Sequence, residues 1–534
     1  MQHALIRRMR REIVRERSLT LLLRSMNAEE RLANTIESRV QQGLVDRGKP
    51  SGLTQINAAP ARRAHSDATP PALPMNPVTP ELLRRYDIAG PRYTSYPTAD
   101  RFVEAFTAAD YGQALAQRRS GAAALTQPLS LYVHIPFCES LCYYCACNKI
   151  ITRHHDRAAV YLRYLAREVD LHTATLGVGQ TVTQLHLGGG TPTFLSDDEL
   201  RELMAMLHRS FTLVPGGEYS IEVDPRTVDA GRLAVLADLG FNRLSFGVQD
   251  FDANVQKAVH RVQPFEQVSA LMAQAREIGF DSINVDLIYG LPRQTPESFA
   301  RTLTQVQQLR PDRIALYAYA HLPERFKPQR RIQQAELPGA AAKVAMLSQS
   351  LAAFLSAGYV YIGMDHFALP NDSLAVTKRQ GRLHRNFQGY STQPDCDLIG
   401  LGVSAIGRIG ATYRQNAKTM EEYCDHLDQG RLPVMRGLAL SRDDLARRAV
   451  IMALMCQGQL VFESIEQAWL LDFKNYFVRE FEQLQELAEH GLIVLDDAGI
   501  QVTAQGWFFV RAVAMVFDRY LQADRTRAKF SRIL

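Results

Sequence analysis

The chain has 534 residues, 46% of them hydrophobic, and its 61 basic and 56 acidic side chains leave a net charge of +5. This length suffices for a large core and a second, smaller domain, and the interspersed charges are those of a solvated surface rather than a nucleic-acid footprint. Seven cysteines are too few for a disulfide framework in so long a chain, and the lack of any run of 18 apolar residues argues against a membrane span.

The first 75 residues differ in composition from the rest of the chain. Residues 7–17 carry six arginines and two glutamates, and residues 49–77 are rich in Pro, Ala, Ser and Arg. This composition predicts a disordered extension that ends in a flexible linker. A true start at Met75 is an alternative interpretation. A membrane-surface helix or targeting peptide over residues 4–25 is another, which the two glutamates weaken.

From residue 129 onward, short β-rich runs alternate with amphipathic stretches. The predicted strands cover residues 129–135, 184–187, 219–223, 243–248, 282–288, 313–317 and 359–362. The predicted helices cover residues 158–173, 197–210, 230–240, 265–278, 295–308 and 341–357. This alternation predicts an α/β fold with a parallel sheet, and six or seven units fit a barrel, complete or open. We assign the barrel to residues 129–370 and its completion to residues 371–437.

The pattern becomes mainly helical after about residue 438. Helices are predicted over residues 442–456, 465–489 and 504–520, and residues 492–501 contain a turn at a glycine. This predicts a small C-terminal helical domain, similar to a winged helix, over residues 438–534. Because no basic recognition stripe is evident, we expect a packing lid or substrate domain rather than a DNA-binding one.

Four cysteines lie within ten residues: Cys138, Cys142, Cys145 and Cys147. The first three have the spacing C-x3-C-x2-C, and soft thiolates this close select an iron–sulfur cluster, Zn or Cu(I). A four-iron cluster normally takes four thiolates, so three on one loop leave one iron open to another ligand. Structural zinc is the alternative, but it usually needs a second separated pair of ligands. Cysteines that must stay reduced predict a cytoplasmic location.

Unusual residues stand at the C-terminal ends of the predicted strands, where parallel α/β folds gather their sites. They are Cys138, the run from Gly188 to Pro192, Glu222, Asp224, Gln249, Asp250, Asp286, Ala320 and His321. Glycines let a ligand approach the backbone and expose N–H groups, or they form a simple turn. Glu222 suits ribose hydroxyls, or it pairs with a neighbouring arginine. Asp286 and Arg261 suit a ligand site, or they pair with each other.

The chain resembles a known family at these positions. The C-x3-C-x2-C spacing, with an aromatic residue before the third cysteine, is the signature of the radical S-adenosylmethionine (SAM) enzymes. The runs PRYTSYP, LYVHIPFC, GGGTPT, IEVDPR, YAHLP and HRNFQGY resemble those of the oxygen-independent coproporphyrinogen III oxidases, and the resemblance covers roughly residues 76–534. It implies that residues 76–128 cover the active site, with Tyr93 and Tyr96 helping to close it.

The resemblance also implies the cofactors and their ligands. A [4Fe–4S] cluster would be held by Cys138, Cys142 and Cys145, and two SAM molecules would bind. The first would contact Tyr132, Tyr144, Gly189, Glu222 and Ile406, and the second would contact Gly190, Thr191, Gln249, Arg261, Asp286 and Ala320. Two departures from the family are small: Tyr144 stands where Phe is common, and Ala146 where Gly occurs.

The implied reaction is a radical decarboxylation. Reductive cleavage of SAM would give a 5′-deoxyadenosyl radical, which starts the conversion of two propionates of coproporphyrinogen III to vinyl groups, yielding protoporphyrinogen IX. A low-potential electron donor of unknown identity is needed, and we expect a monomer without nucleic-acid or membrane partners.

Two other classes share parts of this pattern. HemW-like haem chaperones share the three-cysteine loop, but they typically lack a fourth cysteine, and their aromatic loop differs from RNFQGY at residues 385–390. Cys147, expected outside the cluster as a catalytic residue, therefore favours the enzyme. A radical methyltransferase that opens the haem ring is the remaining alternative.

Overall fold

A computed structural model describes residues 80–86, 88–121 and 127–523 of the chain. The predicted extension over residues 1–75, and the question of its start, lie outside the described residues. Within the described part, no helix combines the length and apolar character that crossing a membrane requires.

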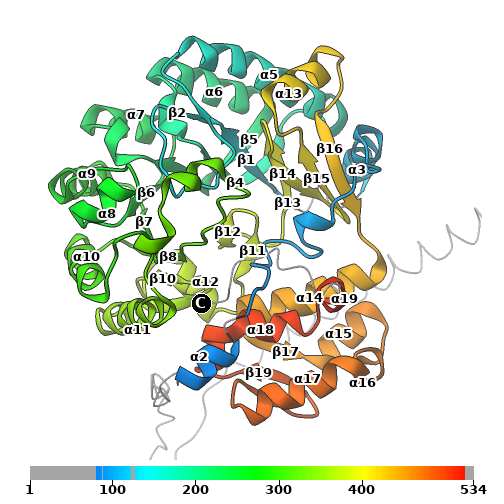
Figure 1. The fold of residues 1–534 in the computed structure, drawn as a ribbon. Helices are drawn as coiled ribbons and strands as arrows, with labels where there is room; N and C mark the ends of the chain where they lie inside the picture. The colour runs from blue at the N-terminus through cyan, green and yellow to red at the C-terminus, as the bar shows by residue number, and fades with distance from the viewer. Residues whose placement is uncertain (1–79, 87, 122–126, 524–534) are drawn as a thin grey trace, which may run out of the picture. The chain divides into compact units, whose positions relative to one another are not determined.

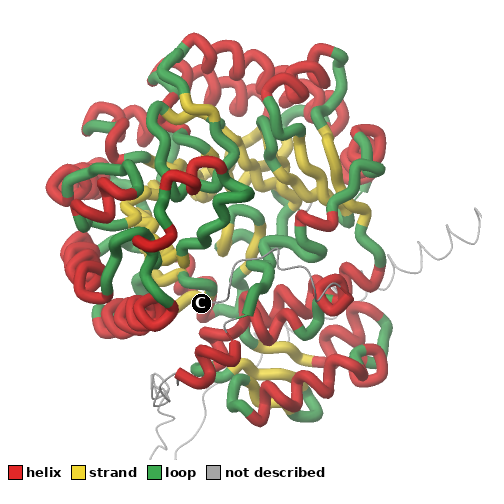
Figure 2. The backbone as a smooth tube through the Cα atoms, in the orientation of Figure 1, coloured by secondary structure: helices red, strands yellow, loops and turns green. Residues whose placement is uncertain are grey.

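Six parallel strands form the centre of the fold, and helices pack outside them (Figures 1 and 2). The strands are β1 (Leu129–Ile135), β4 (Gln180–Gly189), β5 (Phe211–Val223), β6 (Arg243–Gln249), β7 (Ser282–Tyr289) and β8 (Arg313–Ala318). The helices that follow them are α5 (Asp156–Leu176), α6 (Asp197–Ser210), α7 (Ala230–Asp238), α8 (Ala253–Ala258), α9 (Phe265–Ile278), α10 (Pro296–Leu309) and α11 (Ala340–Ser356). The predicted alternation over residues 129–357 is confirmed.

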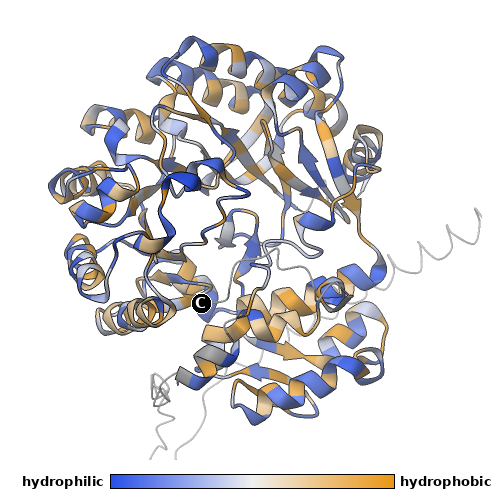
Figure 3. Cartoon of the chain, in the orientation of Figure 1, coloured by the Kyte–Doolittle hydropathy of each residue, from blue (hydrophilic) through white to orange (hydrophobic). Residues whose placement is uncertain are grey.

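Local sequence signals explain the sharp helix ends. The Ser196 side chain accepts the Glu199 N–H, and the Glu199 carboxylate accepts the Ser196 N–H, a capping box that starts α6 at its predicted residue. Gly279 ends α9 in a left-handed conformation that glycine adopts without strain. Strand β1 is almost wholly buried, as expected of a parallel strand covered on both faces. Colouring the cartoon by residue hydropathy shows hydrophobic residues along the strands (Figure 3).

The sheet stays open because its two edges do not pair. Its order is β16-β15-β14-β13-β1-β4-β5-β6-β7-β8-β10-β9. Strand β13 (Asp397–Leu401) runs parallel to β1, and β14 (Ile406–Ile409), β15 (Thr412–Asn416) and β16 (Val434–Ala439) continue antiparallel beyond it. Residues 371–437 were expected to complete the barrel; they contain β13, β14 and β15, and β16 starts within them and ends at Ala439.

One strand departs from the expected alternation. Residues 359–362 were predicted to extend the parallel series, but β9 (Val360–Gly363) pairs with β10 (His366–Ala368), which runs antiparallel to β8. The chain reverses at Met364 and Asp365, both with positive φ, so this edge is a hairpin.

The N-terminal end of the barrel is filled by a buried ion-pair network. Glu218 accepts hydrogen bonds from Arg243 at 3.0 Å and Arg313 at 3.2 Å, and Arg313 also pairs with Asp372 at 2.8 Å. Burial would raise the pKa of Glu218, but the two guanidinium groups lower it to about 2. These side chains border a polar cavity of about 610 Å³ at this end of the barrel.

The C-terminal domain forms a second core. It contains α14 (Arg442–Gln457), α15 (Phe462–Trp469), α16 (Phe473–Tyr476), α17 (Val478–Glu489), α18 (Val510–Met515) and α19 (Arg519–Ala523) around β17 (Gln459–Val461), β18 (Ile493–Leu495) and β19 (Gly499–Val502). The mainly helical domain is confirmed, but two predicted helices are broken. Leu470, with φ +49°, ends α15, and Asp472 caps α16, so residues 465–489 form three helices. Asp518 accepts the N–H groups of Tyr520 and Leu521 and starts α19 separately from α18.

The N-terminal segment joins both parts of this structure. It carries α2 (Pro80–Tyr86), η1 (Ala99–Arg101) and α3 (Ala108–Ser120). Val103 forms a backbone bridge to Gly437 in β16, while Tyr86, Tyr93 and Tyr96 are buried in the second core. The segment is therefore held by the barrel at one end and by the C-terminal domain at the other.

Candidate active site

The cysteine loop is fixed at both ends by a small parallel pair. Strand β2 (Phe137–Cys138) pairs with β3 (Ile150–Ile151), so residues 139–149 project as a closed loop from the end of β1. Within the loop, the Cys145 N–H donates to the Cys142 carbonyl at 3.3 Å, and the Tyr143 N–H donates to the Val259 carbonyl at 3.0 Å. Backbone bonds thus hold the loop between β1 and the segment after α8.

Each of the three predicted ligand thiols has a distinct environment. Thr191 donates its hydroxyl to Cys138 Sγ at 3.3 Å, and burial raises the pKa of Cys138 to about 11. Arg226 and Arg261 approach Cys142 Sγ at 3.6 and 3.5 Å. A hydrogen bond from Cys147 lowers the pKa of Cys145 to about 6. Guanidinium groups and hydrogen-bond donors beside sulfur favour the thiolates that metals bind.

The residues present fit an iron–sulfur cluster. All seven cysteines are free, and three of them share a loop fixed at both ends. No group of three His, Cys, Asp or Glu side chains in the described part of the chain converges closely enough to hold a single metal ion. In a cluster each thiolate binds a different iron, so such convergence on one point is not needed.

The glycine run packs against the cysteine strand. A Cβ on Gly190 would lie 2.7 Å from the Phe137 carbonyl oxygen, so only glycine fits where this backbone passes the cysteine strand. We expected these residues to expose N–H groups, but all three amides are used inside the protein. The N–H groups of Gly189, Gly190 and Thr191 donate to Glu222, Ile135 and Phe137 respectively, at 2.8 to 3.1 Å. The run therefore acts through close packing.

Glu222 lies at the end of β5, facing β4. Its carboxylate accepts the Gly189 N–H at 3.1 Å and lies 3.4 Å from His186 Nε2, and no arginine pairs with it within the described residues. The alternative of a salt bridge with an arginine is therefore wrong. Burial would raise the pKa of Glu222, but His186 and the Gly189 amide hold it below its usual value. The carboxylate is half exposed and negatively charged, as binding to ligand hydroxyls requires.

Tyr132 forms an aromatic wall beside this carboxylate. Its ring stacks on His186 with centroids 5.9 Å apart, and its hydroxyl lies 3.0 Å from His134 Nδ1. His134 Nε2 lies 2.9 Å from the carbonyl of Asn148 in the cysteine loop. Strand β1, strand β4 and the loop are thus connected by side chains at one edge of the sheet.

Arg261 and Asp286 do not pair with each other, so the interpretation that they form an ion pair is wrong. Arg261 donates to Asp224 at 3.1 Å and to the Gly247 carbonyl at 2.7 Å. Asp286 accepts from Ser245 at 3.2 Å and from Asn284 at 2.9 Å. Burial and the neighbouring charge of Glu222 raise the pKa of Asp286 to about 6.

A small cavity of about 90 Å³ lies inside the barrel between these groups. Its lining includes the predicted residues Glu222 and Asp286, Gln388 and Tyr390 from the run RNFQGY, and His366 and Phe367. It also includes residues that the sequence did not single out, namely His186, Ser220, Ser245, Asn284 and Tyr317. Gln388 Oε1 and Arg385 Nη1 are buried without a hydrogen-bond partner in the described structure. For the polar residues that line this cavity, the only signal in the sequence is their position on the inward-facing side of consecutive strands.

The remaining predicted residues come from separate parts of the fold. Gln249 ends β6 with φ +69°, and Ala320 follows β8. Ile406 begins β14. Tyr93 and Tyr96 are almost wholly buried; Tyr93 donates to Asp518 at 2.9 Å, and Tyr96 accepts the Arg519 N–H. Both tyrosines anchor the covering segment to the C-terminal domain.

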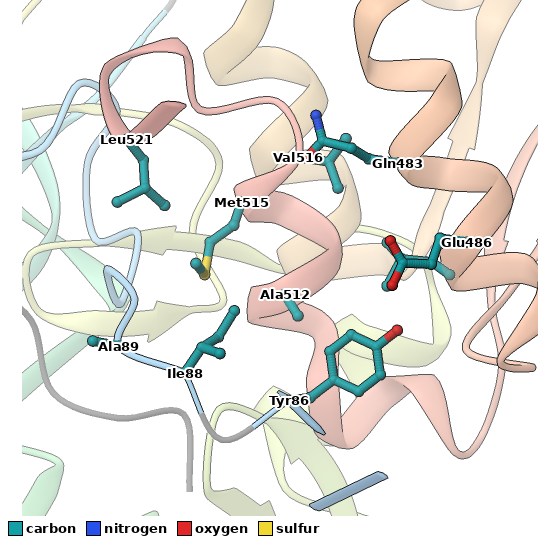
Figure 4. A pocket seen from close by; sticks show the side chains of 10 residues that line it. Tyr86, Ile88, Ala89, Gln483, Glu486, Ala512, Met515, Val516 and Leu521 are labelled. Carbon is teal, nitrogen blue, oxygen red and sulfur yellow. The ribbon is translucent and has the colours of Figure 1, made fainter. Parts of the chain in front are cut away.

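A separate apolar cavity lies at the base of the N-terminal segment (Figure 4). It measures about 480 Å³ and is bordered by Tyr86, Ile88, Met515 and Val516, with Glu486 at one side. None of the predicted site residues lines it, so it does not belong to the site at the strand ends.

Comparison with known proteins gives consistent matches. Residues 132–306 match the family model of the radical SAM superfamily, and residues 440–509 match that of the HemN C-terminal domain. The oxygen-independent coproporphyrinogen III oxidase of Pseudomonas aeruginosa is 51% identical over 456 residues, which cover 85% of this chain and 98% of that protein. The protein of the same name from Escherichia coli K12 is 49% identical over 453 residues, with the same coverage.

A solved structure agrees with these relatives. The coproporphyrinogen III oxidase (HemN) of Escherichia coli, described as a radical SAM enzyme, superposes with a TM-score of 0.77 at 50% identity. The superposition covers 80% of this chain and 98% of the other.

Proposed function

The chain belongs to the family of oxygen-independent coproporphyrinogen III oxidases within the radical SAM superfamily, and we propose that it converts two propionates of coproporphyrinogen III to vinyl groups, giving protoporphyrinogen IX. The observation that supports this most directly is the three-cysteine loop fixed by β2 and β3 beside Glu222 and the glycine run. These groups stand at the strand ends where a parallel barrel carries its chemistry.

Cys138, Cys142 and Cys145 would hold the [4Fe–4S] cluster. When bound, the cluster would supply the electron for reductive cleavage of SAM, and the radical released would remove a hydrogen atom from the propionate; loss of CO2 and of one electron to an acceptor would then leave the vinyl group. The protein supports this with charge: Arg226 and Arg261 face Cys142 and offset the negative charge of thiolates. Asp224, paired with both arginines, fixes their direction.

The remaining site residues would bind and orient two SAM molecules. Tyr132, Tyr144, Gly189, Glu222 and Ile406 would contact the first, with the Glu222 carboxylate accepting ribose hydroxyls. Gly190, Thr191, Gln249, Arg261, Asp286 and Ala320 would contact the second. Three of these, Gln249, Arg261 and Asp286, come from β6, the segment after it and β7, whose ends adjoin in the sheet.

Cys147 would act outside the cluster. Its side chain is exposed beside Cys145, and the Lys149 ammonium donates to the Cys147 carbonyl at 3.4 Å. Tyr93 and Tyr96 would act by anchoring the covering segment. We also propose a monomer in a reducing, cytoplasmic compartment, supplied by a low-potential electron donor.

The test uses the full chain, reconstituted anaerobically with iron and sulfide. With SAM, dithionite and coproporphyrinogen III, we expect protoporphyrinogen IX. Absence of this product together with stoichiometric haem binding would instead indicate a haem chaperone.

The ligand assignment has its own test. Cys138→Ala, Cys142→Ala and Cys145→Ala should each lose the cluster absorbance, whereas Cys147→Ala should keep the cluster and lose turnover. Loss of the cluster in Cys147→Ala would mean a site with four thiolates.

A further inference from the structure

A basic cavity lies beside the cysteine loop. It measures about 740 Å³ and lies among the covering segment, the loop after β8 and strands β14 to β16. Four of its lining side chains are cationic, namely Arg92, Arg325, Lys418 and Arg436, and Asp100 is the one anionic side chain. Its volume is that of a small-molecule site rather than of a packing defect.

Three of these cations have no carboxylate within ion-pair distance among the described residues. Arg92 pairs with Asp365 at 3.5 Å, and Asp100 pairs with Arg101 at 3.3 Å. In contrast, no described carboxylate lies within ion-pair distance of Arg325, Lys418 or Arg436. Arg436 donates to the neutral amide of Gln415 at 2.8 Å.

The electrostatics show that these cations repel one another. Burial lowers the pKa of Lys418, and the charges of Arg436 and Arg325 lower it further. Burial likewise lowers the pKa of Arg436; Asp100 and Glu104 partly offset this, and the charge of Arg325 adds to the lowering. An anion bound between these groups would remove the repulsion, so this arrangement of cations is electrostatically matched to negative charge.

Hydrogen bonds tie this cavity to the cysteine loop from two sides. Asn148 of the loop donates its side-chain amide to the Lys418 carbonyl at 3.0 Å. Gln329, four residues after Arg325, donates to the Tyr144 carbonyl at 3.0 Å. Ile406, a proposed SAM contact, lines the cavity wall. A ligand in the cavity therefore lies next to the reaction site.

We propose that Arg325, Lys418 and Arg436 form a carboxylate-binding site that grips the propionates of the porphyrinogen that are not reacting. This rests on the proposed function, because coproporphyrinogen III carries four propionates. Arginine binds carboxylates through two parallel N–H donors, and lysine adds a point charge. Held at its other propionates, the macrocycle would present one propionate at a time to the interior of the barrel. Arg92, already paired with Asp365, would border the ligand without supplying its main charge.

The test measures binding apart from turnover. Coproporphyrin III, the oxidised and air-stable macrocycle, and its uncharged tetramethyl ester are titrated against the cluster-loaded protein by fluorescence quenching. The wild type should prefer the tetracarboxylate. Arg436→Gln and Arg325→Gln should each weaken coproporphyrin binding and raise KM for coproporphyrinogen III by about tenfold or more, with ester binding unchanged. Lys327→Gln, an exposed lysine of the same loop that does not line the cavity, is the matched control and should bind as the wild type does.

Three outcomes would overturn the proposal. Variants that bind coproporphyrin like the wild type, but turn over slowly only when a protein donor replaces dithionite, would mark a donor-docking surface. Variants that lose SAM cleavage measured without porphyrinogen would mark a SAM contact. Equal loss of acid and ester binding would mark a change of shape rather than of charge. Failure of the proposed function is recognised separately, because then the wild type itself makes no protoporphyrinogen IX.

Discussion

Glu168 and Arg414 form a fully buried ion pair at the seam where β13 joins β1. Both side chains have no solvent exposure, and Arg414 Nη1 lies 3.6 Å from Glu168 Oε1. The Glu168 carboxylate also accepts hydrogen bonds at 2.7 Å each from the Gly402 N–H, the Asn416 amide and the Tyr423 hydroxyl. Since Gly402 follows β13 and precedes Ile406, this network positions one wall of the proposed site.

We predict that Glu168→Gln destabilises the protein by about 3–5 kcal/mol. The amide has nearly the shape of the carboxylate but leaves the buried Arg414 guanidinium without an opposite charge. His172, which contacts Arg414, cannot compensate, because an imidazole supplies no negative charge. Burial and the arginine charge lower the pKa of His172 to about 3, so it stays neutral and adds no further positive charge. Removing both charges in Glu168→Gln/Arg414→Met should cost less than the sum of the single changes.

The assay is urea unfolding followed by circular dichroism, with a double-mutant cycle. Both tryptophans, Trp469 and Trp507, lie in the C-terminal domain, so fluorescence alone would miss a loss confined to the barrel. The midpoint should fall with an unchanged slope. The control is Asp428→Asn, which breaks an exposed ion pair with Arg167, the neighbour of Glu168 on helix α5. This change should have little effect on the free energy of unfolding. Strict additivity of the two single changes, or a loss below about 1 kcal/mol for Glu168→Gln, would refute the reasoning.

Three further predictions follow from features of the barrel. The folded pKa of Glu218 lies below its unfolded value of 4.5, so its ion pairs stabilise the protein above pH 4.5 and this contribution is lost as the pH falls toward 2. The free energy of unfolding of Glu218→Gln, from urea titrations, should therefore fall less between pH 4.5 and pH 2 than that of the wild type, by about 3 kcal/mol; parallel pH profiles of the two proteins would contradict this. Gly190→Ala should displace the cysteine strand and lower iron content at unchanged secondary structure, whereas Gly112→Ala, in open space on α3, should retain iron; full iron loading of Gly190→Ala would show that the strand yields. Lys378 donates to the carbonyls of Tyr361 and Ile362 and lies 4.3 Å from the Trp507 ring centroid, so Lys378→Met should cost about 1–3 kcal/mol and shift tryptophan emission; an unchanged spectrum and midpoint would mean that this contact is dispensable.

The regular part of the fold was predictable because its signals are local. Alternating strand and helix patterns, a capping box at Ser196 and a terminal glycine at Gly279 each act within a few residues. The hairpin of β9 and β10 was not predictable, because its reversal depends on positive φ at Met364 and Asp365. Glycines at these two positions would have indicated a turn, whereas Met and Asp do not.

The parts of the site whose residues lie in one short run could be predicted from the sequence. The parts that combine residues from distant segments could not. The cysteine loop and Glu222 carry their own motifs. The partner of Arg261 is Asp224, 37 residues away, and only the packing of β5 against β6 selects it over Asp286. The basic cavity brings together residues from four separate segments, each of which alone has the composition of a solvated surface.

The anchoring of the covering segment has a consequence for biosynthesis. Tyr93 bonds to Asp518, 425 residues further along the chain. The cysteine loop therefore leaves the ribosome long before the contact that holds this wall exists, and domains generally fold in the order in which they are made. Iron and sulfide can therefore reach the thiols before the covering segment has its C-terminal anchor.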